Sequence, residues 1–320
     1  MNSIFGPVPS RRLGRSLGID VIPPKTCSFD CIYCESGPTT RLSVKKEYFV
    51  DPSEVLAELD AFFRLHPDAA DVLTFSGAGE PTLYAGLGEL IHAVKKAYPR
   101  LPSIVLTNGS LLWDPDVRRS LLKADRVVPS LDAVSAAVFR KINRPHPSLD
   151  PLRIIEGIRA FRKEYKGQLH VEIALVSGMN DSEEELSTLA GAVESIRPEK
   201  VELNTVARPP AIPGTRGLSD ARMQWAASFF RSLNAEIVGV FQSDEQARGE
   251  EQIALRIVET VERRPCAVPE LAASLGVSEK AVEQEAQRLV QQGKLRKVQF
   301  DGKPFLCTVN PGNCRFASEE

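Results

Sequence analysis

Three cysteines stand close together near the start of the chain, in the segment Cys-Ser-Phe-Asp-Cys-Ile-Tyr-Cys. They are Cys27, Cys31 and Cys34. Cysteine thiolates bind iron, and an iron–sulfur cube normally takes four of them. Three cysteines on one short loop would bind three irons of such a cube and leave the fourth iron open to another ligand. The spacing therefore predicts a [4Fe–4S] cluster that is held by these three residues.

Two other interpretations of these cysteines stay open. Zinc usually takes four ligands, and the histidine nearest in the sequence is His66, in a segment with helical periodicity. Free cysteines are also commonly buried as small apolar side chains. Cys266, Cys307 and Cys314 are spread over the C-terminal part of the chain. They are either ordinary thiols or ligands of an auxiliary cluster.

A second group of residues, Ser-Gly-Ala-Gly-Glu-Pro, follows an apolar run that is typical of a strand. It contains Gly77, Gly79 and Glu80. It is not the dinucleotide-binding fingerprint, because Thr82 stands where the third glycine is required. Taken alone, the segment indicates a tight turn between a strand and a helix. Ligands bind at the carboxyl ends of the strands in parallel sheets, so we expect this turn and the cysteine loop to face the same space.

Small polar side chains end two further strand-like runs. Asn108 ends one of them, and Ser130 and Asp132 end the other. These side chains supply both donors and acceptors, which suits the hydroxyl groups of a ribose. A turn at Asn108 and a helix cap at Asp132 would explain the same residues without a ligand.

Arginines flank these motifs. Arg11 and Arg12 precede the first strand-like run, and Arg208 follows the last one, shortly after Asn204. A guanidinium group binds carboxylate or phosphate in a bidentate manner, so these residues are candidates for substrate recognition. Surface arginines are mostly solvated, however, and that interpretation stays open as well.

The elements that must position these residues follow an alternating pattern. Strand-like apolar runs alternate with amphipathic helical stretches from about residue 17 to 240, which is typical of βα units around a parallel sheet. The candidate strands are residues 17–22, 71–77, 103–109, 126–132, 170–176 and 200–206. Helices are expected over residues 53–65, 182–196 and 219–233. Six strands in this order predict an α/β fold of the (β/α)6 type.

The pattern changes after about residue 240. Residues 249–265 form one amphipathic stretch that ends near Pro265, and a second helix, a turn at residues 275–277 and a third helix from Ser278 follow. Two strand-like runs then flank Asp301 and Gly302, a pair typical of a hairpin turn. We therefore predict two domains, residues 1–240 and residues 241–320, of which the second is like a winged helix-turn-helix.

Composition and charge set broad limits. The 320 residues are 42% hydrophobic and 26% charged with a net charge of −2, as expected for a globular chain. The first 15 residues lack the apolar core of a signal peptide, and no run of about 18 apolar residues occurs. We expect a cytoplasmic protein with reduced thiols and no membrane contact.

Residues 27–34, with Tyr33 before the last cysteine, resemble the signature of the radical S-adenosylmethionine (SAM) superfamily. Gly-Ala-Gly-Glu-Pro resembles that superfamily's Gly-Gly-Glu-Pro motif. Over about residues 4–240, the segments FGPVPSRRLGRSLGIDVIPPKTCSFDCIYC, FSGAGEPTL, SLDA, KINRP and LNTVARPP resemble prokaryotic Fe–S oxidoreductases related to wyosine base (4-demethylwyosine) synthases. The resemblance does not extend to the second cluster of wyosine synthases, because no cysteine precedes Cys27.

The resemblance implies a partial TIM barrel in which a [4Fe–4S] cluster reductively cleaves SAM to a 5′-deoxyadenosyl radical. It implies that the loop of Gly77, Gly79 and Glu80 binds the methionine ammonium group and that Tyr33 lies near the adenine. The ribose contacts would come from the polar residues at the strand ends, namely Asn108, Ser130 and Asp132. No catalytic residue is assigned beyond the cluster ligands.

The sequence thus predicts a radical SAM enzyme that takes an electron from flavodoxin or ferredoxin. Its substrate, whether RNA, peptide or small molecule, is not identified, and RNA modification is one option. The alternative is an Fe–S-containing winged-helix regulator that binds DNA and does not turn over. Residues 245–320 carry 11 Lys and Arg against 12 Asp and Glu, a net charge of −1. Phosphate contacts dominate DNA affinity, so DNA is not the expected partner.

Overall fold

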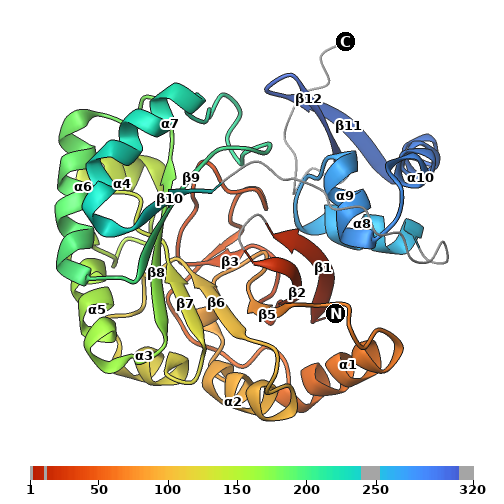
Figure 1. Ribbon diagram of the computed structural model, residues 1–320, viewed down its shortest axis with the longest axis horizontal. Coiled ribbons are helices and arrows are strands. Elements are labelled where there is room, and N and C mark those ends of the chain that lie inside the picture. Colours follow the sequence, from red (N-terminus) through yellow and green to blue (C-terminus); the bar gives the residue numbers. More distant parts are fainter. Residues whose placement is uncertain (1–2, 11–12, 239–252, 310–320) are drawn as a thin grey trace.

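The computed structural model describes residues 3–10, 13–238 and 253–309. Figure 1 shows a curved sheet whose outer side is covered by helices, with a smaller C-terminal group of helices and strands beside it. We call residues 253–309 the C-terminal unit. Within the described ranges, no helix is both long enough and apolar enough to cross a membrane.

The large sheet has eight strands in the order β1-β2-β5-β6-β7-β8-β9-β10. From β2 to β10 all neighbours are parallel, and β1 is antiparallel to β2. The strands are β1 (Ile4–Ser10), β2 (Gly14–Ile19), β5 (Val72–Phe75), β6 (Ser103–Thr107), β7 (Arg126–Pro129), β8 (Gln168–Leu175), β9 (Lys200–Thr205) and β10 (Ala235–Ile237). The six expected strands are present in the expected order, and an α/β fold with a parallel sheet is confirmed. The sequence analysis missed the two edge strands, β1 and β10.

Helices follow most of these strands and pack against the sheet through one shared apolar core. They are α1 (Pro52–Leu65), α2 (Leu87–Ala97), α3 (Pro115–Leu121), α4 (Ala136–Ile142), α5 (Pro151–Glu164), α6 (Glu183–Ile196) and α7 (Asp220–Ala227), with 3₁₀ turns η1 (Pro81–Leu83) and η2 (Ser228–Leu233). Three helices, α1, α3 and α5, begin with a capping Asp followed by Pro. This pair fixes a helix start, because the Asp accepts a free amide hydrogen and Pro has none to leave unpaired. The single helix expected over residues 219–233 is instead α7 followed by η2.

The C-terminal unit has its own apolar core, which includes Ile257, Leu271 and Leu289. It consists of α8 (Ile253–Arg263), α9 (Val268–Leu275), α10 (Glu279–Gln291) and a hairpin of β11 (Leu295–Phe300) and β12 (Lys303–Thr308). Gly276 ends α9 in the left-handed region, and the hairpin turn has positive φ at Asp301 and Gly302. The elements follow the order expected from the sequence. The two turns between them are formed by residues that adopt positive φ angles readily.

Candidate functional site

The three cysteines lie on the loop that follows β2, at the carboxyl edge of the sheet. The short strands β3 (Thr26–Cys27) and β4 (Arg41–Leu42) pair with each other and close this loop at its base. The amide of Ile32 donates to the carbonyl of Ile142 at 2.9 Å and ties the middle of the loop to the end of α4. The strand pairing therefore holds the loop at its base, and the hydrogen bond to Ile142 holds it at its centre.

The sulfur atoms of two cysteines receive side-chain amide groups. Asn108 Nδ2 lies 3.5 Å from Cys27 Sγ, and Asn143 Nδ2 lies 3.5 Å from Cys31 Sγ. Burial raises the pKa of the Cys27 thiol to about 12 and also raises the pKa values of Cys31 and Cys34. Metal binding at such a site must therefore displace protons from thiols that hold them tightly.

Asp132 joins several parts of the site through one buried carboxylate. It accepts hydrogen bonds from Tyr33 OH at 2.5 Å, Asn143 Nδ2 at 2.6 Å and the amide of Ala174 at 2.9 Å. Burial raises its pKa, while these three donors act in the opposite direction. The carboxylate orients the Asn143 amide toward Cys31. The sequence analysis did not single out Asn143, although KINRP contains it.

Glu80 is buried and its carboxylate is occupied within the protein. Oε1 accepts from the backbone amide and hydroxyl of Thr82 and from the Thr107 hydroxyl, and Oε2 accepts from the Asn108 amide at 2.7 Å. Burial raises its pKa, and the hydrogen bonds act against that effect. The contacts join the turn after β5 to the end of β6. Its proposed contact with a methionine ammonium group stays a prediction.

The two glycines of this turn allow a close approach of neighbouring segments. A Cβ atom at Gly77 would lie 2.0 Å from Cγ of Asp20, and one at Gly79 would lie 2.4 Å from the carbonyl oxygen of Thr26. Glycine is therefore required at both positions for the turn after β5 to rest against β2 and the cysteine loop.

A cavity of about 430 Å³ opens at the carboxyl edge of the sheet. Among the residues expected at the site, Cys31, Tyr33, Cys34, Gly77 and Ser130 line it. Asn108, Ser130 and Asp132 line a much smaller pocket of about 10 Å³ beside it. The structure thus brings the expected residues into one region, with Cys27, Gly79 and Glu80 behind the cavity wall.

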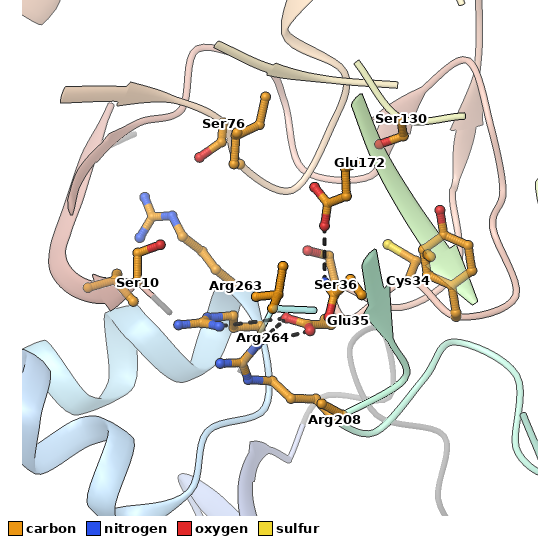
Figure 2. A pocket seen from close by; sticks show the side chains of 18 of the residues that line it. Ser10, Cys34, Glu35, Ser36, Ser76, Ser130, Glu172, Arg208, Arg263 and Arg264 are labelled. Atoms are coloured by element: carbon orange, nitrogen blue, oxygen red, sulfur yellow. Dashed lines mark hydrogen bonds and ion pairs between the residues drawn. The ribbon is translucent and has the colours of Figure 1, made fainter. Parts of the chain in front are cut away.

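Glu172 was missed by the sequence analysis. It lies on β8, faces the cavity in Figure 2, and accepts a hydrogen bond from Asn204 Nδ2 at 3.0 Å. A charged residue in the middle of a mostly apolar strand, QLHVEIAL, was the available signal, because charged residues are rarely buried without a partner.

Arg208 lines the cavity, and two carboxylates bind its side chain; its role in substrate recognition stays a prediction. Arg208 is 5% exposed. Its guanidinium group lies 2.9 Å from both carboxylate oxygens of Glu35 and 2.8 Å from Glu270 Oε1 (Figure 2 shows the Glu35 side). Burial lowers its pKa, but the charges of Glu35 and Glu270 outweigh this effect and raise it. Arg11 and Arg12 lie outside the described residues.

The C-terminal unit supplies part of the cavity wall. Thr260, Arg263 and Arg264 line the cavity, and all three lie on or next to α8. The guanidinium group of Arg263 lies 4.4 Å from the ring centroid of Phe5 on β1. Cys266 and Cys307 are buried, and Cys314 lies outside the described residues.

The donor set suits a cluster better than a single ion. In the parts of the chain that are described, no three His, Cys, Asp or Glu side chains gather closely enough to hold one metal ion. A cube that is held by three cysteines has one thiolate on each of three irons, so its ligands are spread around it. The three thiols on one loop, with a cavity open at Cys31 and Cys34, fit this arrangement.

The fold is a parallel α/β sheet, and three cysteines lie on the loop after its first parallel strand and face a cavity at the carboxyl edge. This arrangement defines a class of Fe–S proteins that bind a ligand beside the cluster. Residues 21–190 match the family model of the radical SAM superfamily, and the chain belongs to this family. Members use a [4Fe–4S] cluster and SAM, so the chain is an enzyme that needs a reductant and a substrate.

Relatives cover nearly the whole chain. A UPF0026 protein of Methanocaldococcus jannaschii is 33% identical over 95% of this chain and 95% of its own length. The GTPase Obg of Brachyspira hyodysenteriae is 37% identical over 93% of this chain. The match covers only 44% of the length of that GTPase. Among solved structures, a radical SAM methyltransferase from Sphaerobacter thermophilus has a TM-score of 0.55 at 19% identity, over 69% of this chain and 66% of its own. This last match shows a similar fold.

Proposed function

We propose that Cys27, Cys31 and Cys34 each bind one iron of a [4Fe–4S] cluster, and that SAM occupies the adjoining cavity. The observation that carries this proposal is the cavity of about 430 Å³, which is lined by both Cys31 and Cys34. A ligand in it can reach an iron that lacks a cysteine. When bound, the cluster passes one electron to SAM, which yields methionine and a 5′-deoxyadenosyl radical that abstracts hydrogen from a substrate.

The residues around the cavity would bind and orient SAM. Gly77 lines the cavity at the turn after β5 and would contact SAM through its backbone, and Tyr33 presents its ring next to the cavity. Ser130 offers a hydroxyl to the ribose. Asn108 and Asp132 already hold neighbouring side chains, so their part is to fix the amides and the tyrosine beside the thiolates.

Gly79 would act on SAM through the backbone of the turn, and Glu80 through its carboxylate. Glu80 Oε2 accepts one hydrogen bond in the protein, from the Asn108 amide, and a carboxylate oxygen can accept a second, for example from an ammonium group. Within the protein, Glu80 holds the turn in place with four hydrogen bonds.

The electron would come from a flavodoxin or a ferredoxin. The cavity wall excludes water from the region where the radical forms, which protects it from side reactions. The substrate is a positioned C–H group of an RNA, a peptide or a small molecule. The resemblance to enzymes related to wyosine synthases favours RNA modification as the first class to test.

We further propose that the chain divides into a radical SAM core of partial TIM barrel type, residues 1–240, and a winged-helix domain, residues 241–320. Three helices, a hairpin and a separate apolar core support this division. The exposed side of α10 includes Glu279, Lys280 and Glu283. This charge does not favour a DNA phosphate backbone, so a substrate- or partner-docking role is preferred to the alternative of a DNA-binding redox regulator.

The test is release of 5′-deoxyadenosine from SAM by anaerobically reconstituted, dithionite-reduced protein. Wild type is compared with Cys31→Ala and with Cys307→Ala, a matched control that removes a buried thiol from β12. Release by wild type and Cys307→Ala, with loss in Cys31→Ala, supports the proposal. No release from protein that carries four irons per chain, or equal release by Cys31→Ala, contradicts it.

A further inference from the structure

Lys25 is a buried cation without a hydrogen-bond partner. It lies two residues before Cys27 and is 6% exposed. Its Nζ atom has no hydrogen-bond partner among the residues that the structure describes. An unpaired ammonium group in the protein interior is strongly unfavourable, so such a residue indicates a missing partner of opposite charge.

The backbone fixes the position of Lys25. Its amide donates to the carbonyl of Ala78 at 2.8 Å, and its own carbonyl accepts from the amides of Thr40 and Arg41 at 3.1 and 3.0 Å. Lys25 therefore joins the turn after β5 to the far end of the cysteine loop. Its φ of +63° lies in the left-handed region, which non-glycine residues rarely adopt. A strained, buried position of this kind is typical of functional sites.

The charges around Lys25 come mainly from the cysteine loop. Burial lowers its pKa, and negative charge on Cys34, then Cys27, then Asp20 acts in the opposite direction. Asp20 already accepts the amide of Ala78 at 3.1 Å and lies 3.8 Å from the guanidinium group of Arg263. The thiol of Cys34 is thus the group of opposite charge that acts most strongly on Lys25.

The other two cysteines have different partners. Cys27 receives the amide of Asn108, and Cys31 receives the amide of Asn143. Lys25 supplies a full positive charge next to the cysteine loop, where it is buried and has no hydrogen-bond partner among the described residues.

We propose that the ammonium group of Lys25 is the electrostatic partner of the cluster and raises the cluster's reduction potential. The inference rests on the proposed function. Reduction adds one negative charge to the cluster, and a nearby positive charge stabilises the product more than the reactant. Net charge and contacts to the sulfurs are known to set such potentials.

The test is an EPR-monitored redox titration of reconstituted protein with dithionite in the absence of SAM. The variants are Lys25→Met and Lys25→Gln, which remove the charge, and Lys25→Arg, which keeps it. Lys45→Met is the matched control, because Lys45 is 78% exposed. We expect the reduced-to-oxidised ratio at a fixed potential to fall at least tenfold in both neutral variants, which corresponds to 59 mV for one electron. Lys25→Arg and Lys45→Met should stay within threefold of wild type.

An unchanged potential in Lys25→Met or Lys25→Gln with full iron content overturns the inference. An unchanged reduction potential together with weaker SAM binding also overturns the inference, because Lys25 would then bind the carboxylate of SAM and not act on the cluster. If both neutral variants lose iron while Lys25→Arg keeps it, the charge requirement is supported. Loss of iron in all three indicates a structural role and contradicts it. Wild type that forms no cluster would contradict the proposed function, and iron content reports this separately.

Discussion

The ion pairs of Arg208 allow a quantitative prediction about how the C-terminal unit is held. The side chain of Arg208 is 6% exposed, and its partners Glu35 and Glu270 are 32% and 18% exposed. Substitution of Arg208 by Met would remove the cation that Glu35 and Glu270 share, while Glu35 keeps a longer contact with Arg264 at 3.6 Å. Removing one partner of a buried pair typically costs about 3–5 kcal/mol. Because Glu35 is partly hydrated, we expect a loss of about 2–4 kcal/mol in the free energy of unfolding.

The assay is urea unfolding of the cluster-free chain, followed by far-UV circular dichroism. Arg118→Met is the comparison variant, because Arg118 pairs with one more exposed carboxylate, that of Glu164, at 3.0 Å and also donates to two backbone carbonyls. Since it pairs with one carboxylate and Arg208 pairs with two, we expect a smaller loss than for Arg208→Met. A triple variant of Arg208→Met with Glu35→Gln and Glu270→Gln should recover part of the loss, since the uncompensated charge is then removed as well.

Two results would refute this reasoning. One is a loss for Arg208→Met no larger than that for the Arg118→Met control. The other is a triple variant that is no more stable than the single variant, which would indicate that packing of the guanidinium group matters and its charge does not. Lys at position 208 should restore only part of the stability, because an ammonium group cannot bind two carboxylates in a bidentate manner.

Three further predictions concern single side chains. Asn143→Leu removes the amide beside Cys31 and should lower the reduction potential of the loaded cluster, as a redox titration would show; an unchanged potential contradicts the role of that contact. Partial burial raises the pKa of Asp125, but the hydrogen bonds that it accepts from Lys95 and from Ser103, the first residue of β6, outweigh this and lower the pKa. Wild type should therefore be more stable than Asp125→Asn by up to about 1 kcal/mol at pH 7, and urea titrations should show this advantage shrinking as the pH falls below 3.8. Tyr33→Phe keeps the ring but loses a buried hydrogen bond, so the free energy of unfolding should fall by about 1–2 kcal/mol, which thermal unfolding would show as a lower midpoint temperature. SAM affinity, measured by equilibrium binding, should change less than threefold.

The fold was predictable because its signals are local. Each central strand is a short apolar run, and helices α1, α3 and α5 each start at an Asp-Pro pair. The edge strands were not predictable in the same way. β1 contains two prolines and a register shift against β2, and β10 has only three residues. Their pairing depends on the sheet that is already formed, so the sequence pattern alone does not reveal them.

The candidate site was predictable only in part. The cysteine spacing and the glycine turn are contiguous motifs, and the structure brings Cys34 and Gly77 to one cavity. The contacts of Asn143 with Cys31 and of Glu185 with the start of α4 link residues that are far apart in the sequence. The amide of Glu185 donates to Ser182 Oγ at the start of α6, which is one half of a capping box. Its carboxylate instead accepts the amides of Val134 and Ser135, because tertiary contacts override the local preference.

The geometry of the C-terminal unit connects the cavity wall with the cysteine loop. Glu35 directly follows Cys34, and its carboxylate binds Arg208, which in turn binds Glu270 on α9. Any movement that takes α9 away from the cavity must break the Arg208–Glu270 contact and leave excess positive charge beside Glu35. Since Glu35 and Cys34 are adjacent in the chain, that change acts on the same loop that holds the thiols. Two guanidinium groups, those of Arg208 and Arg264, therefore connect the C-terminal unit to the loop that holds Cys34.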